Sequence, residues 1–338
     1  MRRLSAMKRD VKSSPGHGGP SLRIRALLWP LALMAVMATN PVQAGTDLAS
    51  EPFQRMGKAL STLNYEGILV YSHDNRMETL RVVHKVEGGQ VQAFMESLNG
   101  QPRTLKQDGG QLTCRLSGDP LIAVARRAVG QEGANSRPLN AEDLAPHYLV
   151  QIQGEARVAN RQTQVVAIIP ADTLRYGYRF YLDTETDLPL KLDLIGGDAR
   201  VIEQLMFTSL VINPVLSAEQ DAESGADIVA TAEARTQTST KWTFEQLPPG
   251  FTLIMSQAER DTGGQEIEHL VLSDGLASIS VYVESGQEKG LLGEAHIGAI
   301  HAQGAKVRGH QVTVVGEVPA ATVSAVAAAL RVRDESRP

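Results

Sequence analysis

Few residues have side chains and spacings that could form a catalytic, metal-binding or phosphate-binding site, and these residues are scattered along the chain. Ser72, His73 and Asp74 have the side chains of a hydrolytic triad, but neighbours in a turn point in different directions, so the order predicts a polar turn. His296 and His301 lie five apart, and neither HExxH nor CxxC occurs, which favours surface or packed histidines over a metal site. The pieces GHGG and DTGGQE lack the strand, helix and lysine of a phosphate-binding loop. We predict no catalytic residue, no bound metal and no cofactor, and hence no enzyme.

Three further patterns each admit a site and a simpler alternative. Asp183, Glu185 and Asp187 have an alternating acidic spacing that suits calcium, but the glycine and distal glutamate of an EF-hand loop are missing, which favours a solvated hairpin turn. His84 shares a strand face with apolar residues, which is more typical of a core histidine than of a ligand. The lone Cys114 lies within an alternating strand pattern, and we interpret it as a small packed side chain rather than a reactive thiol or an intermolecular bridge.

The most regular pattern is an apolar hairpin over residues 176–194, with DTETD as its turn. Every second residue on each strand is apolar: Tyr176, Tyr178, Phe180 and Leu182, then Leu188, Leu190, Leu192 and Leu194. Such a face must meet a core, an enclosed helix or a ligand, and ordinary core is favoured for any single residue. The candidate apolar ligand groove consists of Leu80, Val82, Tyr176, Tyr178, Phe180, Leu190 and Leu192.

The elements that must position this groove follow from hydrophobic periodicity. Phe53, Met56 and Leu60 predict a helix that Asp47 caps, with Pro52 in its first turn, ending before Asn64. From residue 65 the period changes to two, and short turns between β-prone runs predict an antiparallel meander. Residues 119–150 are less regular and predict one or two short helices, after which strands resume up to residue 212.

The composition changes again after residue 214. Residues 215–240 are rich in Ala, Ser and Thr, contain no aromatic residue and indicate an interdomain connection. Residues 241–333 then predict several antiparallel strands and a closing helix from Pro319. We therefore expect an α+β protein, mainly antiparallel β, with a domain over residues 45–214 and a smaller α+β domain over residues 241–333.

The N-terminus has the three parts of a secretory signal. The first 25 residues carry seven basic and one acidic side chain, an uncharged apolar run fills residues 26–38, and Val42 and Ala44 suit a signal peptidase. We predict a signal peptide over residues 1–44, cleaved after Ala44, and a soluble periplasmic product. The long basic stretch leaves Met1 and Met7 as alternative starts.

Composition excludes several classes of protein. The 338 residues are 42% hydrophobic and 21% charged, which excludes wholesale disorder, and one Cys excludes a disulfide framework. The net charge of −5 argues weakly against nucleic acid as a partner, and it divides into +6 on the basic leader and −11 on the mature chain. From the residues alone we expect an exported binding protein rather than an enzyme.

Several segments in order along the mature chain resemble the RseB/MucB family. They are LNYEG at 63–67, Leu80, Arg81 and His84, PR at 102–103, YLDTETDLPLKLDL at 181–194, W...LPPGF at 242–251, SDG at 273–275 and VTVVGEVPAAT at 312–322. The resemblance implies an N-terminal domain like the lipoprotein carriers, a curved half-open β-barrel with helices, and a smaller α+β domain. It also implies a periplasmic negative regulator in the envelope stress response.

Such a regulator binds the periplasmic part of a single-pass transmembrane anti-sigma factor and shields it from site-1 proteolysis. Release by lipopolysaccharide or by lipoprotein acyl chains would start the cleavage. The alternative is a periplasmic lipoprotein or lipid carrier, which the N-terminal half alone would permit. The sequence leaves open which lipid is sensed, whether the protein forms a homo-oligomer, and which residues contact the anti-sigma factor.

Overall fold

A computed structural model describes residues 46–99, 104–108, 111–114, 144–214, 228–231, 241–260, 266–285 and 290–333. All of them belong to one compact unit, Gly45–Pro338. Within these ranges no helix is both long and apolar enough to cross a bilayer. The predicted signal peptide, the GHGG piece and most of the irregular stretch 119–150 lie outside the described residues.

The N-terminal helix begins earlier than its sequence predicted. Helix α1 spans Thr46–Thr62, so Asp47 is its second residue rather than a cap, and Pro52 lies inside the helix rather than in the first turn. Its end before Asn64 is confirmed. Phe53, Met56 and Leu60 are buried together on one face, in the core of the first sheet. That apolar face holds α1 in place, because a helix of this length is marginal without tertiary packing.

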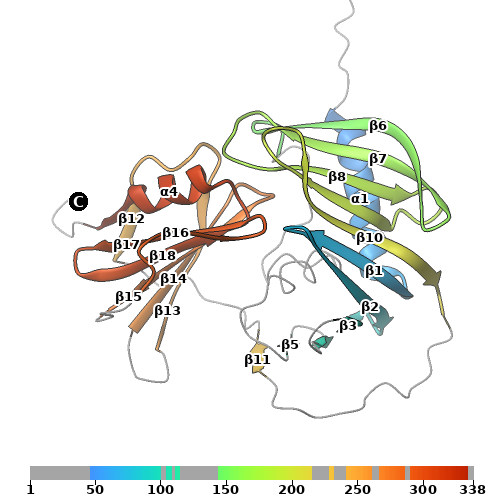
Figure 1. The fold of residues 1–338 in the computed structure, drawn as a ribbon, viewed down its shortest axis with the longest axis horizontal. Helices are drawn as coiled ribbons and strands as arrows, with labels where there is room; N and C mark the ends of the chain where they lie inside the picture. Colours follow the sequence, from blue (N-terminus) through green and yellow to red (C-terminus); the bar gives the residue numbers. More distant parts are fainter. Residues whose placement is uncertain are drawn as a thin grey trace, which may run out of the picture. The chain divides into compact units, whose positions relative to one another are not determined.

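Eleven antiparallel strands form the first sheet, in the order β11-β5-β4-β3-β2-β1-β10-β9-β8-β7-β6 (Figure 1). Their bounds are β1 Tyr65–His73, β2 Arg76–Glu87, β3 Gln90–Ser97, β4 Thr104–Asp108, β5 Gln111–Cys114, β6 Tyr148–Val158, β7 Arg161–Pro170, β8 Gly177–Asp183, β9 Pro189–Ile195, β10 Val201–Ile212 and β11 Ile228–Thr231. The described strands at its two ends, β11 and β6, do not pair with each other. The sheet is therefore a curved, half-open barrel that packs on α1, as expected.

Tight turns set the register of the meander. β1 and β2 are joined by Asp74 and Asn75, and β6 and β7 by Ala159 and Asn160, and all four residues have positive φ. Two consecutive residues of this kind form the hairpin turn whose twist matches that of the flanking strands. Alternating burial along β1 then places one face of the sheet in the core.

One strand comes from the segment that the sequence assigned wholly to a connection. Within residues 215–240, Ile228–Thr231 forms β11 and pairs antiparallel with β5, so that Ile228 lies opposite Cys114. The side chain of Cys114 lies outside the described residues. The chain therefore returns to the first sheet before it enters the second.

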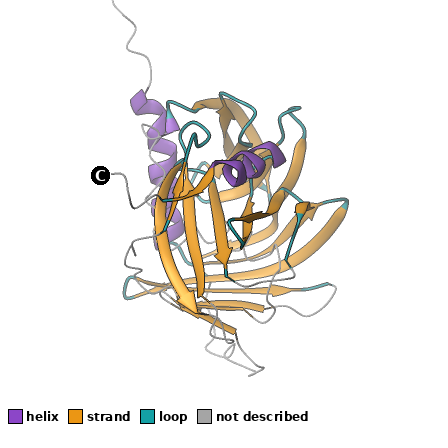
Figure 2. Ribbon diagram, turned by 90° about the vertical axis from the view of Figure 1, so that its left-hand side faces the viewer, coloured by secondary structure: helices purple, strands orange, loops and turns teal. Residues whose placement is uncertain are grey.

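The second sheet has six antiparallel strands in the order β13-β14-β15-β18-β17-β16. Their bounds are β13 Thr252–Arg260, β14 Glu266–Ser273, β15 Ser278–Glu284, β16 Gly293–Ile297, β17 Ile300–Val307 and β18 His310–Gly316. Helix α4, Ala320–Ala329, lies against this sheet and confirms the predicted closing helix (Figure 2). A separate pair joins β12, Trp242–Phe244, to β19, Leu330–Val332, a strand that the sequence did not predict.

Apolar core and joint between the two sheets

The seven candidate groove residues all lie in the core of the first sheet. Leu80 and Val82 come from β2, Tyr178 and Phe180 from β8, and Leu190 and Leu192 from β9, while Tyr176 precedes β8; none is more than 9% exposed. All seven share one cluster with the apolar face of α1. The ring of Phe53 meets Phe180 edge to face at 5.9 Å. The apolar hairpin face therefore meets an enclosed helix, one of the three alternatives left open above.

Burial raises the pKa of two tyrosines in this core. It raises the pKa of Tyr176 to about 12, with a further contribution from the Glu203 carboxylate. Burial also raises the pKa of Tyr65, which lies fully inside the same core. Both phenols are neutral at physiological pH, so neither Tyr176 beside the hairpin nor Tyr65 of β1 places a charge in this core.

His84 is a core histidine, as predicted. Its side chain is fully buried, its ring stacks on Tyr65 with centroids 4.7 Å apart, and Nδ1 lies 2.9 Å from the carbonyl oxygen of Leu63. Within the described part of the chain Nε2 has no hydrogen-bond partner. Burial lowers the pKa of His84 more than the Leu63 carbonyl raises it, so the ring is neutral at pH 7.

The acidic turn between β8 and β9 is solvated only in part: Glu185 is exposed, as predicted, but Asp183 is buried. Asp183 is 1% exposed and makes a bidentate pair with Arg161 at 2.8 Å for both contacts, while Arg55 of α1 binds Asp187 at 3.0 Å. Arg161 also contacts Glu185. The three carboxylates are thus engaged by two arginines, and the described residues contain no metal-binding group of His, Cys, Asp and Glu. The turn fastens α1 to the sheet.

Ser72, His73 and Asp74 do not converge on one point. The His73 ring stacks on Tyr71 at 4.5 Å and lies 3.4 Å from Glu78, whereas Asp74 accepts a hydrogen bond from the backbone of Gly298 in the second sheet. The predicted polar turn is confirmed at Asp74, which forms it with Asn75, whereas Ser72 and the buried His73 are the last two residues of β1.

His296 and His301 face each other across β16 and β17, with ring centroids 5.6 Å apart. His296 is exposed and His301 is half-buried, which matches the expected surface or packed histidines. Burial lowers the pKa of His301, and its neighbour His296 lowers it further. A pair of this kind needs a third ligand to hold a metal, and the described residues supply none.

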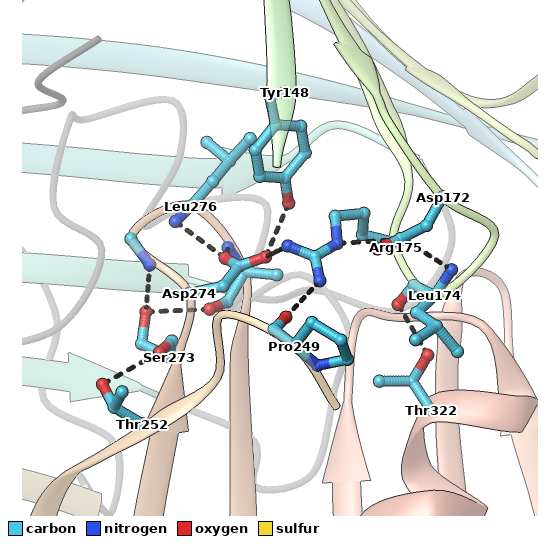
Figure 3. A network of polar contacts seen from close by, with 12 residues as sticks. Tyr148, Asp172, Leu174, Arg175, Pro249, Thr252, Ser273, Asp274, Leu276 and Thr322 are labelled. Atoms are coloured by element: carbon cyan, nitrogen blue, oxygen red, sulfur yellow. Dashed lines mark hydrogen bonds and ion pairs between the residues drawn. The ribbon is translucent and has the colours of Figure 1, made fainter. Parts of the chain in front are cut away.

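A buried arginine joins the two sheets (Figure 3). Arg175, two residues before β8, lies 3.0 Å from the Asp274 carboxylate of the β14–β15 turn and donates to the carbonyl oxygen of Pro249. Asp172 binds its Nε at 3.1 Å, and Tyr148 donates to Asp274 at 2.8 Å. Both charged side chains of the central pair are fully buried. We call these residues, Tyr148, Asp172, Arg175, Pro249 and Asp274, the arginine joint.

Aromatic rings and backbone amides complete the arginine joint. The Arg175 guanidinium lies 5.4 Å from the ring centroid of Tyr148 and 5.3 Å from that of Phe251. The second oxygen of Asp274 accepts from the backbone N–H groups of Leu276 and Ala277. A buried ion pair is tolerated only when its remaining hydrogen-bonding capacity is met in this way.

A second contact lies at the turn between β16 and β17. The carboxylate of Glu203 accepts from the Ala299 backbone at 2.8 Å and from the Tyr71 hydroxyl at 2.9 Å. Ala299, and Leu276 from the arginine-joint turn, are buried within the core of the first sheet. Two turns of the second sheet thus insert apolar side chains into the first core, and the β16–β17 turn also donates a hydrogen bond to the Glu203 carboxylate of the first sheet. Sequence reasoning found the SDG segment at 273–275, as part of the family resemblance, but missed Arg175 and Glu203.

Comparison with known proteins gives the family. The MucB/RseB N-terminal domain matches residues 49–226, and the MucB/RseB C-terminal domain matches residues 236–331. The sigma factor AlgU regulatory protein MucB of Pseudomonas aeruginosa is 32% identical over 92% of this chain and 98% of that protein. The sigma-E factor regulatory protein RseB of Escherichia coli K12 is 24% identical over 84% of this chain and 91% of that protein.

Solved structures agree with the sequence relatives. A complex of Pseudomonas aeruginosa MucA and MucB matches 85% of this chain and 99% of the solved chain, with 27% identity and a TM-score of 0.68. A structure of MucB alone matches 86% of this chain and 99% of the solved chain, with 29% identity and a TM-score of 0.62. The chain described here belongs to the MucB/RseB family.

Proposed function

We propose that this protein is a non-enzymatic regulator that binds the periplasmic part of a transmembrane anti-sigma factor. The observation that carries the proposal is the match of both domains to a family whose members regulate sigma factors. Support comes from the similarity to MucB solved in complex with MucA(peri), at 27% identity and a TM-score of 0.65. The signal peptide predicted over residues 1–44 supports the periplasm as the compartment.

Binding would shield the anti-sigma factor from the site-1 protease. An amphipathic ligand that binds better to a form unable to hold the anti-sigma factor would shift the population toward that form and permit cleavage. We propose lipopolysaccharide or lipoprotein acyl chains as this amphipathic ligand.

The apolar groove residues are our proposed contact for an acyl chain. Because Phe53 of α1 packs on Phe180, a chain entering between the sheet and the helix would have to displace the helix or its side chains. Such displacement offers a physical route from lipid binding to a change in the protein surface.

A cleavage assay with purified components tests the proposal. The mature chain from Gly45 is mixed with the anti-sigma periplasmic domain and the site-1 protease, with and without lipopolysaccharide. We expect slow cleavage without lipid and fast cleavage with it. Cleavage that the protein leaves unchanged in the absence of lipid would contradict the regulator and leave a lipid carrier as the better interpretation.

A further inference from the structure

Two sheets leave four edge strands among the described residues, and three of them are unsuited to pairing with another chain. β11 has four residues and β16 has five and carries Glu294; β13 exposes Leu253 and Ile254, but a bulge between Leu253 and Met255 interrupts it there, and it ends in Glu259 and Arg260. Short length, charge, proline and bulges are the usual features that keep an edge from pairing.

The fourth edge strand, β6, lacks this protection over its first half. It is eleven residues long, its bulge lies beyond this half, between Ile152 and Gly154, and residues 148–153 carry no charge. Leu149 is 61% exposed and Ile152 is 50% exposed, and Leu149 lies opposite the exposed Ile169 of β7. A long, uncharged edge with exposed apolar side chains is a surface that pairs readily with an extended chain.

The backbone groups that point away from β7 can be assigned. The N–H of Ala171 donates to the carbonyl of His147 at 2.9 Å, so residues 147 and 171 form a hydrogen-bonded pair. Such pairs alternate along an antiparallel ladder, and the register is regular from Tyr148 to Ile152. The N–H and C=O groups of Val150 and Ile152 therefore point outward, away from β7.

This edge begins at the arginine joint. Tyr148, the first residue of β6, donates its hydroxyl hydrogen to Asp274 of the second sheet. An extended segment that pairs with Val150 and Ile152 would thus run to the point where the two sheets meet. Binding there would be sensitive to any change that opens the joint.

We propose that β6 binds an extended, uncharged segment of the anti-sigma periplasmic domain by strand addition. The inference rests on the proposed function. Main-chain hydrogen bonds to Val150 and Ile152 give the affinity, and apolar side chains at alternate positions of the segment cover Leu149 and Ile169. The absence of charge along this half of the strand favours an uncharged segment, because a charged one would lose hydration without gaining an ion pair.

The first test compares two variants of one residue. Ile152→Pro removes the outward N–H group and leaves the hydrogen bonds to β7, because edge strands accept proline where the N–H faces solvent. Ile152→Thr keeps that N–H group but, like the proline variant, loses the apolar isoleucine side chain. With the mature chain and the purified anti-sigma domain, we expect the proline variant to bind about tenfold more weakly and the threonine variant less than about threefold. Equal affinities for the two variants would overturn the proposal.

The second test needs no variant and decides the matter if Ile152→Pro does not fold. Amide hydrogen exchange of the wild-type mature chain should show new protection of Val150 and Ile152 when the anti-sigma domain binds. Binding without new protection at β6 overturns strand addition and leaves the regulator intact. Protection that rises with protein concentration alone would instead assign the edge to a second copy of this chain. Absence of any binding would remove the proposed function itself.

Discussion

Single side chains in the first core depend on burial for their protonation state. His84 is fully buried with one ring nitrogen bonded to Leu63, and its pKa is lowered mainly by that burial. A histidine whose pKa is lower in the folded protein than in the unfolded chain stabilises the fold above its ordinary pKa of about 6.5. That stabilisation is lost as the pH falls through the folded pKa.

We therefore expect His84→Asn to weaken the pH dependence of stability between about pH 7.5 and 5. Asparagine can still donate to the Leu63 carbonyl but does not titrate. The free energy of unfolding of the wild type should fall with decreasing pH more steeply than that of the variant, by at most about 1.4 kcal/mol per pH unit. Urea titrations of both proteins at several pH values measure this. Parallel curves would show that His84 does not titrate in this range.

Asp183 is an acid whose charged form is stabilised by the fold, so it affects stability over a lower pH range than His84 does. Burial alone would raise its pKa, but hydrogen bonds from Arg161 and Thr186 outweigh that effect and lower it. The stabilisation is then complete above the ordinary pKa of about 4 and is lost as the pH falls further. Asp183→Asn should therefore lower the free energy of unfolding at pH 7 and have a smaller effect at pH 3. Thermal melts at both pH values check this, and an equal loss at the two would refute it.

At the scale of elements, helix α1 contributes apolar side chains to the core of the first sheet. Its Phe53 is 2% exposed and contacts Phe180, whereas Gln54 on the same helix is exposed. Phe53→Ala should lower the free energy of unfolding by about 3–4 kcal/mol, because it removes buried area and leaves a cavity. Gln54→Ala is the matched control and should change it by less than about 0.5 kcal/mol. Chemical denaturation of both variants tests the difference.

Most elements could be predicted from the sequence because their periodicity is long enough to read. The alternation of Tyr178, Phe180 and Leu182 on β8 gave both the strand and its buried face. β11 and β19 could not be predicted, because strands of four and three residues show no clear alternation and depend on partners elsewhere in the chain. The early start of α1 was missed because Pro52 is typical of a first turn.

The arginine joint could not be predicted for a related reason. Arg175 and Asp274 are separated by 99 positions, and only the folded sheets bring them together. Their sequence neighbours, Leu174 and Gly275, carry no sign of a buried ion pair. The groove residues were found by their pattern, but whether they line a ligand site or only a core was left open by sequence and stays a prediction.

For the molecule as a whole, the arginine joint is the contact whose loss should be most visible. Asp274→Ala leaves Arg175 buried with one fewer partner, and removing one member of a buried pair typically costs about 3–5 kcal/mol. The control is Arg331→Ala, which breaks the exposed pair with Glu245 and should cost less than about 1 kcal/mol. We expect Asp274→Ala, but not Arg331→Ala, to unfold in two separate calorimetric transitions. A single transition at the wild-type temperature would show that the joint contributes little.

The pairing of β12 with β19 has a consequence for the order in which the chain can fold. Trp242 lies near the start of the second domain, yet its strand pairs with Leu330–Val332, almost ninety positions later. Leu330 is itself fully buried in the same core. A ribosome or a translocation channel releases Leu330–Val332 after the other strands of the second domain, so this domain cannot close until those residues have emerged. The first eleven strands are all available before that moment, and a nascent chain would pass through a stage in which only the first sheet is complete.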